Sequence, residues 1–155
     1  MAGCTNSPRV EEEEALDPAP SSAQEALDPA LSNAKEALMQ CRYAHPDEIT
    51  HAAARAACVN KATELMRPML PFPDLLDQEN ALRKSLAEQV QTRKLSLLER
   101  NQQITKFHSK MLAEEQSRLL ANPSPNASVP AAATQWRLSN PDGCATLGGN
   151  KANCY

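Results

Sequence analysis

A stretch without proline or glycine, from Asp74 to Leu120, constrains the fold of this chain more than any other feature. Leu, Lys, Arg, Glu and Gln dominate the stretch, and all of them are good helix formers. Its 47 residues (120 − 74 + 1) would form a helix about 70 Å long at the usual rise per residue. Such a helix is too long to lie inside a small globule. We therefore predict a coiled-coil helix over 74–120 that packs against other helices.

Apolar residues recur along this predicted helix at intervals of seven, which is the spacing of a left-handed coiled coil. One column is strictly apolar, whereas a second holds Arg93 and Arg100 beside Leu86. This mixed second column favours a heteromeric bundle, in which each chain supplies part of the core, over a symmetric homodimer. The predicted partner-binding residues are Leu82, Leu86, Val90, Leu97, Ile104, Phe107 and Met111.

Charged residues cover the remaining faces of the predicted helix. We expect most of them to be solvated and a few to select the partner and the register, since exposed pairs contribute only about 0.2–0.5 kcal/mol each. His108 lies among lysines and is expected at the surface as well. The charged residues are Arg83, Lys84, Glu88, Arg93, Lys94, Glu99, Arg100, Lys106, Lys110, Glu114, Glu115 and Arg118.

A proline-rich turn over 67–73 precedes the long helix. Pro68, Pro71 and Pro73 cannot continue the upstream helix, because proline lacks a backbone N–H and clashes with the preceding turn. Asp74 follows them at the position of an N-cap, where a side-chain oxygen accepts from a free backbone N–H. The turn therefore separates two helical regions and fixes where the second begins.

Residues 17–66 are predicted to form Ala-rich helices, and they open with a tandem repeat. Segment 17–27 returns as 28–38, with eight of eleven positions identical. A continuous helix would align the two copies, because eleven residues make three turns. Pro29, however, predicts an interruption, so we expect a frayed first copy and a helix from 28 to 44. Asp47 is then expected to cap a further helix that runs to about residue 66.

Composition limits the core that this chain can build alone. Aromatic residues make up 3% of the sequence, and much of the apolar content is alanine, which buries little area. Residues 1–16 are predicted to be a disordered acidic N-terminus and 121–155 a disordered tail. In that tail, Trp136 is either a short docking anchor or an incidental aromatic. The expected fold is all-α, an extended helical hairpin or coiled coil with one long C-terminal helix, stabilised by partner chains.

The sequence contains no pattern that predicts catalysis or metal binding. Cys41, His45, His51 and Cys58 are possible zinc ligands, but they lack the tight Cys-x2-Cys knuckle of structural sites. Five cysteines, an odd number without paired spacing, do not predict a disulfide framework. No glycine-rich phosphate loop is present, and carboxylate pairs are expected only on solvated faces. We therefore expect no enzyme activity, no cofactor and no metal.

Charge and hydropathy also exclude several partner classes. Residues 1–50 carry ten acidic and three basic residues, a net charge of −7, which leaves +4 for the rest of the −3 chain. No basic stripe with interleaved aromatics is present, so direct nucleic-acid binding is not expected. No stretch approaches the roughly 18 apolar residues of a membrane span, and no secretory signal pattern opens the chain. The expected partners are other helical proteins, with no membrane and no small molecule, in the nucleus or the cytoplasm.

The segment "LPFPDLLDQENALRKSLAEQVQTRKLSLLERNQQITKF" at 70–107 resembles subunit 9 of the Mediator complex. The resemblance covers residues from about 50 to 110. It is carried by Leu70 to Pro73, Gln78, Leu82, Leu86, "EQVQTRK" at 88–94, Leu97, Leu98, Lys106 and Phe107. It implies a nuclear, non-catalytic subunit of the middle module that links regulators to RNA polymerase II through neighbouring helical subunits. Two other interpretations stay open, a coiled-coil subunit of a cytoplasmic tethering or kinetochore assembly and a self-associating coiled coil.

Overall fold

The computed structural model describes residues 22–122 and 136–137, with side chains from residue 29 onward in those ranges. All regular secondary structure in these residues is helical, so the all-α prediction is confirmed. The long C-terminal helix that the sequence predicts is also present. The elements are α1 (Ser22–Ala44), the short 3-10 helix η1 (Ile49–His51), α2 (Ala52–Thr63), the 3-10 helix η2 (Glu64–Met69), α3 (Pro73–Gln91) and α4 (Leu97–Ala121).

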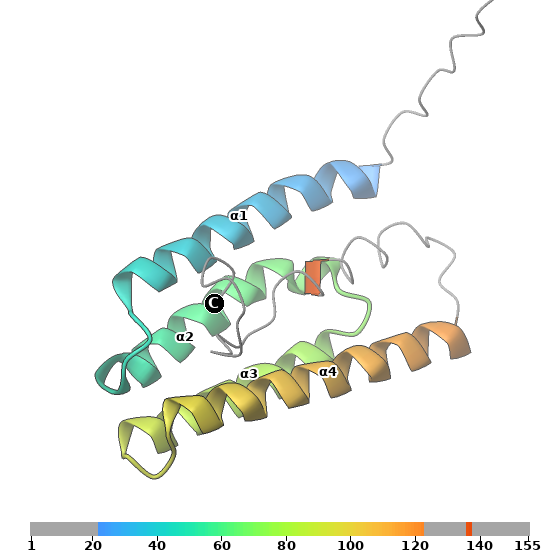
Figure 1. The fold of residues 1–155 in the computed structure, drawn as a ribbon. Helices are drawn as coiled ribbons and strands as arrows, with labels where there is room; N and C mark the ends of the chain where they lie inside the picture. The colour runs from blue at the N-terminus through green and yellow to red at the C-terminus, as the bar shows by residue number, and fades with distance from the viewer. Residues whose placement is uncertain (1–21, 123–135, 138–155) are drawn as a thin grey trace, which may run out of the picture.

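The four α-helices pack side by side, and each is antiparallel to the next in the chain (Figure 1). Helix α1 packs on α2, α2 on α3, and α3 on α4, so α1 and α4 lie on opposite sides of the α2–α3 pair. The larger apolar cluster joins α1, α2, η2 and α3, and Trp136 completes it. A smaller cluster of Ala52, Ala56, Ala87 and Val90 joins α2 to α3 near the α3–α4 turn. None of the described helices is long and apolar enough to cross a membrane.

The expected continuous helix over 74–120 is instead two helices, because the chain turns back on itself at 92–96. Arg93 adopts a left-handed conformation with φ of 59°. Its N–H donates to the carbonyl of Val90 at 2.9 Å, and that of Lys94 donates to Gln89 at 2.8 Å. These are the two bonds of a Schellman motif, which usually places glycine where Arg93 stands. The prediction was wrong because a non-glycine residue closes the first helix.

A capping box starts the second of these helices. Ser96 is the N-cap of α4, and its hydroxyl accepts from the backbone N–H of Glu99 at 3.1 Å. In return, the Glu99 carboxylate accepts from the backbone N–H of Ser96 at 3.0 Å. The hydrogen bonds from Ser96 also lower the pKa of the Glu99 carboxyl. "SLLE" at 96–99 is the Ser-x-x-Glu pattern of this motif, so the sequence did contain a signal for the break.

Two further expectations about helix ends are corrected. Helix α1 runs through Pro29 rather than stopping there, so parts of both repeat copies lie in one helix. Proline removes one backbone hydrogen-bond donor, and α1 continues past Pro29 without that hydrogen bond. Helix α3 begins at Pro73, with Phe72 in the N-cap position and no side-chain cap. Asp74 therefore lies in the first turn of α3, where its carboxylate accepts from Arg118 at 2.8 Å.

A disulfide bond joins Cys41 of α1 to Cys58 of α2, which the cysteine count did not predict. The two Cα atoms are 5.6 Å apart, within the range that a disulfide spans. The residues are 17 apart in the chain but meet because α1 and α2 form an antiparallel pair. Spacing rules overlook such a pair because the helical hairpin, rather than the sequence interval, brings the sulfurs together.

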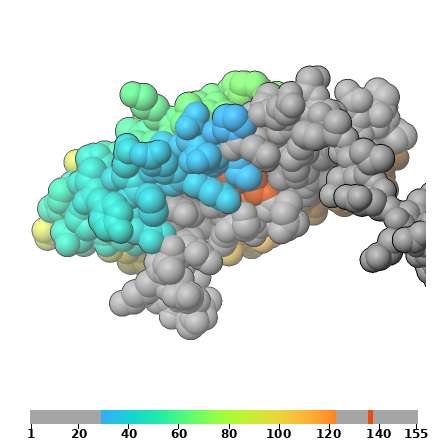
Figure 2. Space-filling view, turned by 90° about the horizontal axis from the view of Figure 1, so that it is seen from above, coloured from blue at the N-terminus to red at the C-terminus, as the bar shows by residue number. Residues whose placement is uncertain are grey.

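The segments predicted to be disordered, 1–16 and 121–155, lie almost wholly outside the described residues. The exceptions are the end of α4 and the dipeptide Trp136–Arg137, which has a defined place in the structure. The dipeptide lies between α1 and α4, close to η2 (Figure 1). From above, its atoms show beside α1 as a small orange-red area (Figure 2). Both residues are buried, so the interpretation of Trp136 as an incidental aromatic was wrong.

Candidate functional site: a buried arginine site between α3 and α4

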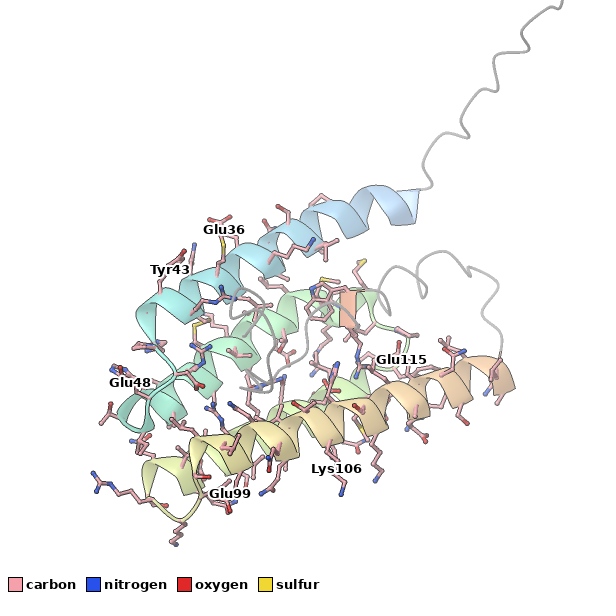
Figure 3. All side chains as sticks on the ribbon, viewed as in Figure 1. Glu36, Tyr43, Glu48, Glu99, Lys106 and Glu115 are labelled. Carbon is pink, nitrogen blue, oxygen red and sulfur yellow. A yellow bond between two sulfur atoms is a disulfide. The ribbon has the colours of Figure 1, made fainter. Side chains whose placement is uncertain are left out.

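Two buried carboxylates from different helices hold the guanidinium of Arg137. Arg137 Nη2 donates to Glu79 Oε1 of α3 at 2.6 Å, and Nη1 donates to Glu115 Oε2 of α4 at 2.7 Å. Glu115 is 1% exposed and Arg137 3% exposed. Glu115 points from α4 toward the dipeptide, whereas Lys106 on the same helix points away from the bundle (Figure 3). The guanidinium fork thus bridges α3 and α4 inside the fold.

His108 links the same carboxylate to the backbone of the dipeptide. Its Nδ1 lies 2.9 Å from Glu79 Oε1, and its Nε2 lies 3.1 Å from the carbonyl oxygen of Arg137. His108 thus bridges the Glu79 carboxylate and the backbone of the dipeptide, and its tautomer decides which ring nitrogen donates. The cluster brings the carboxylates of Glu79 and Glu115 against the guanidinium of Arg137.

The helical periodicity of α4 explains why these groups face one another. His108 and Glu115 are seven residues apart, two helical turns, so they lie on one face of α4. Asn101, seven residues before His108, is buried on the same face. Because α3 and α4 are antiparallel, this face meets Glu79 near the middle of α3. The result is a polar column along the inner face of α4, beside an apolar one.

Trp136 fills the apolar half of the site. It belongs to the larger apolar cluster, and its ring lies among buried side chains of α1, α2, η2 and α3. A small cavity remains where the apolar and charged halves of the site meet. The residues lining it are Leu38, Thr63, Leu76, Glu79, His108, Trp136 and Arg137. The dipeptide thus presents one aromatic ring to an apolar pocket and one cation to an acidic pocket.

A second polar network joins α2 to α3. Arg83 donates to the side-chain oxygens of both Asn60 and Asn80, the latter at 2.5 Å. Thr63 Oγ1 donates to Asn80 Oδ1 at 3.2 Å, and the Asn80 amide donates to Glu64 at 3.0 Å. Arg83, Asn80 and Thr63 are all buried. These hydrogen bonds satisfy polar groups in the core and fix the register of α2 against α3.

A third network ties the α1–α2 connection to α4. Asp47, expected to be a helix cap, instead accepts from Arg100 Nη2 at 2.5 Å and lies 3.8 Å from Arg55 Nε. Arg55 and Arg100 are both buried. Burial lowers the pKa of the Arg55 guanidinium, and the nearby Asp47 carboxylate opposes that effect. One carboxylate therefore pairs with two buried arginines at this end of the bundle.

The structure places the seven predicted partner-binding residues within the chain's own fold. Four of them are buried and three are half-buried. The buried residues are Leu86, Val90, Ile104 and Met111, and the half-buried ones are Leu82, Leu97 and Phe107. Packing among the helices of the chain itself covers the apolar column without a second chain. Contact of these residues with a partner stays a prediction, and it falls most naturally on the half-buried three.

Sequence reasoning missed the buried charges. Arg83, Arg100, Glu115 and His108 were expected on solvated faces, and all four are buried. One signal was available, because Asn101, His108 and Glu115 repeat at intervals of seven beside an apolar column. That pattern indicates a helix interface with a polar column beside the apolar one. The charges of these residues nevertheless led us to expect them at the surface. Arg137, which pairs with both carboxylates of this interface, lies 58 residues from Glu79 in the chain.

The arrangement can bind a cation, and it favours a guanidinium over an ammonium. Two carboxylates on opposite sides match the planar fork of arginine, whereas lysine offers a compact charge. Among the described residues, no group of three or more His, Cys, Asp and Glu side chains could hold a metal ion. Of the four residues considered for zinc, Cys41 and Cys58 are bonded to each other. The rings of His45 and His51 lie 6.3 Å apart between their centroids.

No family model matches the chain, and neither the curated proteins nor the solved structures compared with it include a match. The resemblance to subunit 9 of the Mediator complex therefore stays a prediction from the sequence.

Proposed function

We propose that the chain is a non-catalytic helical subunit of a multiprotein complex, bound to its partners through the outer face of α1. The observation that carries this proposal is a pair of large apolar side chains on α1. Tyr43 is 80% exposed and Met39 is 47% exposed, and they lie one turn apart. Residues four apart are neighbours on a helix surface, so the two form one contiguous patch. Tyr43 and Glu36 both point away from the bundle (Figure 3).

The sequence resemblance names the complex in this proposal. It supports a transcription coactivator, similar to the Mediator middle module, that links regulators to RNA polymerase II in the nucleus. In this proposal the α3–α4 pair takes the place of the expected extended coiled coil. Its half-buried residues Leu82, Leu97 and Phe107 are proposed as additional contacts with partner helices. A tethering or kinetochore assembly in the cytoplasm is the alternative complex for the same subunit.

The Cys41–Cys58 disulfide is the observation least compatible with either location. Disulfides persist in oxidising compartments, whereas the nucleus and the cytosol keep thiols reduced. In a reducing compartment the α1–α2 contact would depend on its apolar side chains alone. The proposal therefore requires that α1 stays packed on α2 when both cysteines are reduced.

The test is affinity purification of the tagged full chain followed by mass spectrometry. We expect the wild-type chain to recover Mediator subunits and a Met39→Ser/Tyr43→Ser variant to lose them. Leu65→Ser is the matched control, because Leu65 is also an exposed apolar residue but lies on η2. Recovery of tethering or kinetochore proteins would replace the coactivator with the alternative complex. Recovery of no specific protein by the wild-type chain would contradict the subunit proposal.

A further inference from the structure

The contacts of Arg137 define a site for a guanidinium inside the fold. Glu79 of α3 and Glu115 of α4 are both buried, and each forms an ion pair with a different terminal nitrogen of Arg137. Removal of one partner from a buried ion pair is strongly destabilising. The helices therefore hold two carboxylates in position for one planar cation.

The dipeptide occupies this site as a short ligand would. Trp136 contributes an aromatic ring to the apolar cluster, and the adjacent Arg137 contributes both of its terminal nitrogens to carboxylates. His108 also contacts the backbone of the dipeptide at the Arg137 carbonyl oxygen. Fourteen residues (122–135) separate the end of α4 from Trp136, enough to span up to about 46–50 Å if extended. The connection is therefore long enough for the dipeptide to leave the site while α4 stays folded.

We propose that Glu79, His108 and Glu115, with the adjoining apolar pocket, form a receptor site for peptide segments in which an aromatic residue precedes arginine. The chain's own Trp136–Arg137 occupies the site in cis. A partner protein that carries an aromatic–arginine segment competes for it and displaces the tail. This inference rests on the proposed function only for the source of the competing segment, since the site itself is read from contacts within the chain.

The charge and shape of the site specify this ligand. Charge-assisted hydrogen bonds to carboxylates are roughly twice as strong as neutral ones, so arginine should be strongly preferred to glutamine. Its planar fork, which reaches both carboxylates at once, should also favour it over lysine. The tethered dipeptide is present at an effective concentration on the order of 1 mM, typical of short linkers. A free peptide should therefore bind an emptied site far better than the occupied site of the wild-type chain.

The direct experiment uses the full chain with Trp136→Ala and Arg137→Ala. Trp136 is the only tryptophan, so this variant has none, and the fluorescence of an added peptide reports binding alone. The probe is a synthetic peptide of residues 131–140, AAATQWRLSN. We expect saturable one-to-one binding with a blue shift of its emission. Lysine in place of its arginine should weaken binding about tenfold and glutamine more, and Glu115→Gln in the receptor should cost a similar factor.

A peptide that binds equally well with glutamine, or that does not saturate, would overturn the proposal. Where circular dichroism shows that the double variant has lost its helices, the wild-type chain is used instead. A tryptophan-free peptide, AAATQFRLSN, should then red-shift the emission of Trp136 as it displaces the tail, and its Arg→Gln form should not. An emission unchanged at about 10 mM peptide, tenfold above the effective concentration, would show that the dipeptide is a fixed part of the fold.

Two outcomes separate this site from the proposed function. Loss of peptide binding with partners still recovered on purification would remove the receptor site and leave the subunit proposal standing. Sedimentation can show whether the wild-type chain forms a dimer that the double variant does not. Such a dimer would mean that the dipeptide of one chain occupies the site of a second copy. That result would overturn the assignment to a partner protein.

Discussion

The α1–α2 and α3–α4 interfaces each join two antiparallel helices, but the first is apolar and the second contains buried charges. Helix α1 meets α2 through apolar side chains and one disulfide bond. Helix α4 meets α3 through a polar column in which Glu79, His108 and Glu115 surround Arg137. Trp136 also packs at the first interface, where it is one apolar side chain of a larger cluster. At the second interface the same segment supplies Arg137, the cation that pairs with both buried carboxylates.

Arg137→Ala should destabilise the α3–α4 interface far more than the α1–α2 interface. Removal of one partner of a buried ion pair leaves an uncompensated charge and costs about 3–5 kcal/mol in the free energy of unfolding. Urea denaturation measures the loss, and hydrogen exchange should locate it in α3 and α4, with α1 and α2 protected. Arg118→Ala is the control, because Arg118 also pairs across α3 and α4 but at the exposed surface. An equal effect of the two substitutions would contradict the account.

Removal of the disulfide should produce the reverse pattern. Cys41→Ser/Cys58→Ser opens a loop with a sequence separation of 17 residues, and cross-links of that size stabilise by about 3 kcal/mol. We expect hydrogen exchange to show lost protection in α1 and α2 only, when the variant is compared with the oxidised wild-type chain. Reduction of the wild-type protein should reproduce the variant. Cys144→Ser serves as the control, and a loss that spread into α3 and α4 would show that the two interfaces are not separable.

Arg93→Gly should stabilise the α3–α4 turn without affecting the α1–α2 interface. A left-handed conformation costs a residue with a Cβ atom roughly 1–2 kcal/mol, and glycine avoids that cost while losing more chain entropy on folding. The expected net gain is about 0.5–1 kcal/mol, measured as a higher urea midpoint. Arg93→Val should lower the midpoint, because a β-branched side chain tolerates the conformation worst. If neither substitution changed stability, the assigned turn geometry would be wrong.

The smallest expected effect is a pH dependence at the α2–α3 side of the bundle. Hydrogen bonds from Arg67 lower the pKa of the Glu64 and Asp77 carboxyls below their ordinary values of 4.5 and 3.8. A carboxyl with a lowered pKa stabilises the fold above its ordinary pKa, and this stability is lost as the pH falls through the lowered value. Urea midpoints between pH 5 and pH 2 should therefore fall less steeply for Arg67→Gln than for the wild type. Identical slopes would show that Arg67 does not contribute to the pH dependence of stability.

The regular parts of the molecule were predictable from the sequence, and the exceptions share a physical cause. Helix-forming composition and prolines gave the all-α fold, the turn before α3 and the end of α4. The break at 92–96 was missed because Arg93 stands where a helix that ends in this way usually has glycine. The Ser96–Glu99 capping box, by contrast, was visible in the sequence. The arginine site could not be read locally. Whether Glu115 is solvated or buried depends on Arg137, which reaches it only through the tertiary fold.

A double-mutant cycle between Glu115→Gln and Arg137→Gln tests most directly whether the tail dipeptide closes the α3–α4 interface. The four unfolding free energies give the coupling between the two side chains, free of effects that each substitution has alone. We predict a coupling of about 2 kcal/mol, as for contacting partners in one buried network. A coupling below about 0.5 kcal/mol, the level expected of independent sites, would show that Arg137 does not bind Glu115 in solution and that the dipeptide does not close this interface.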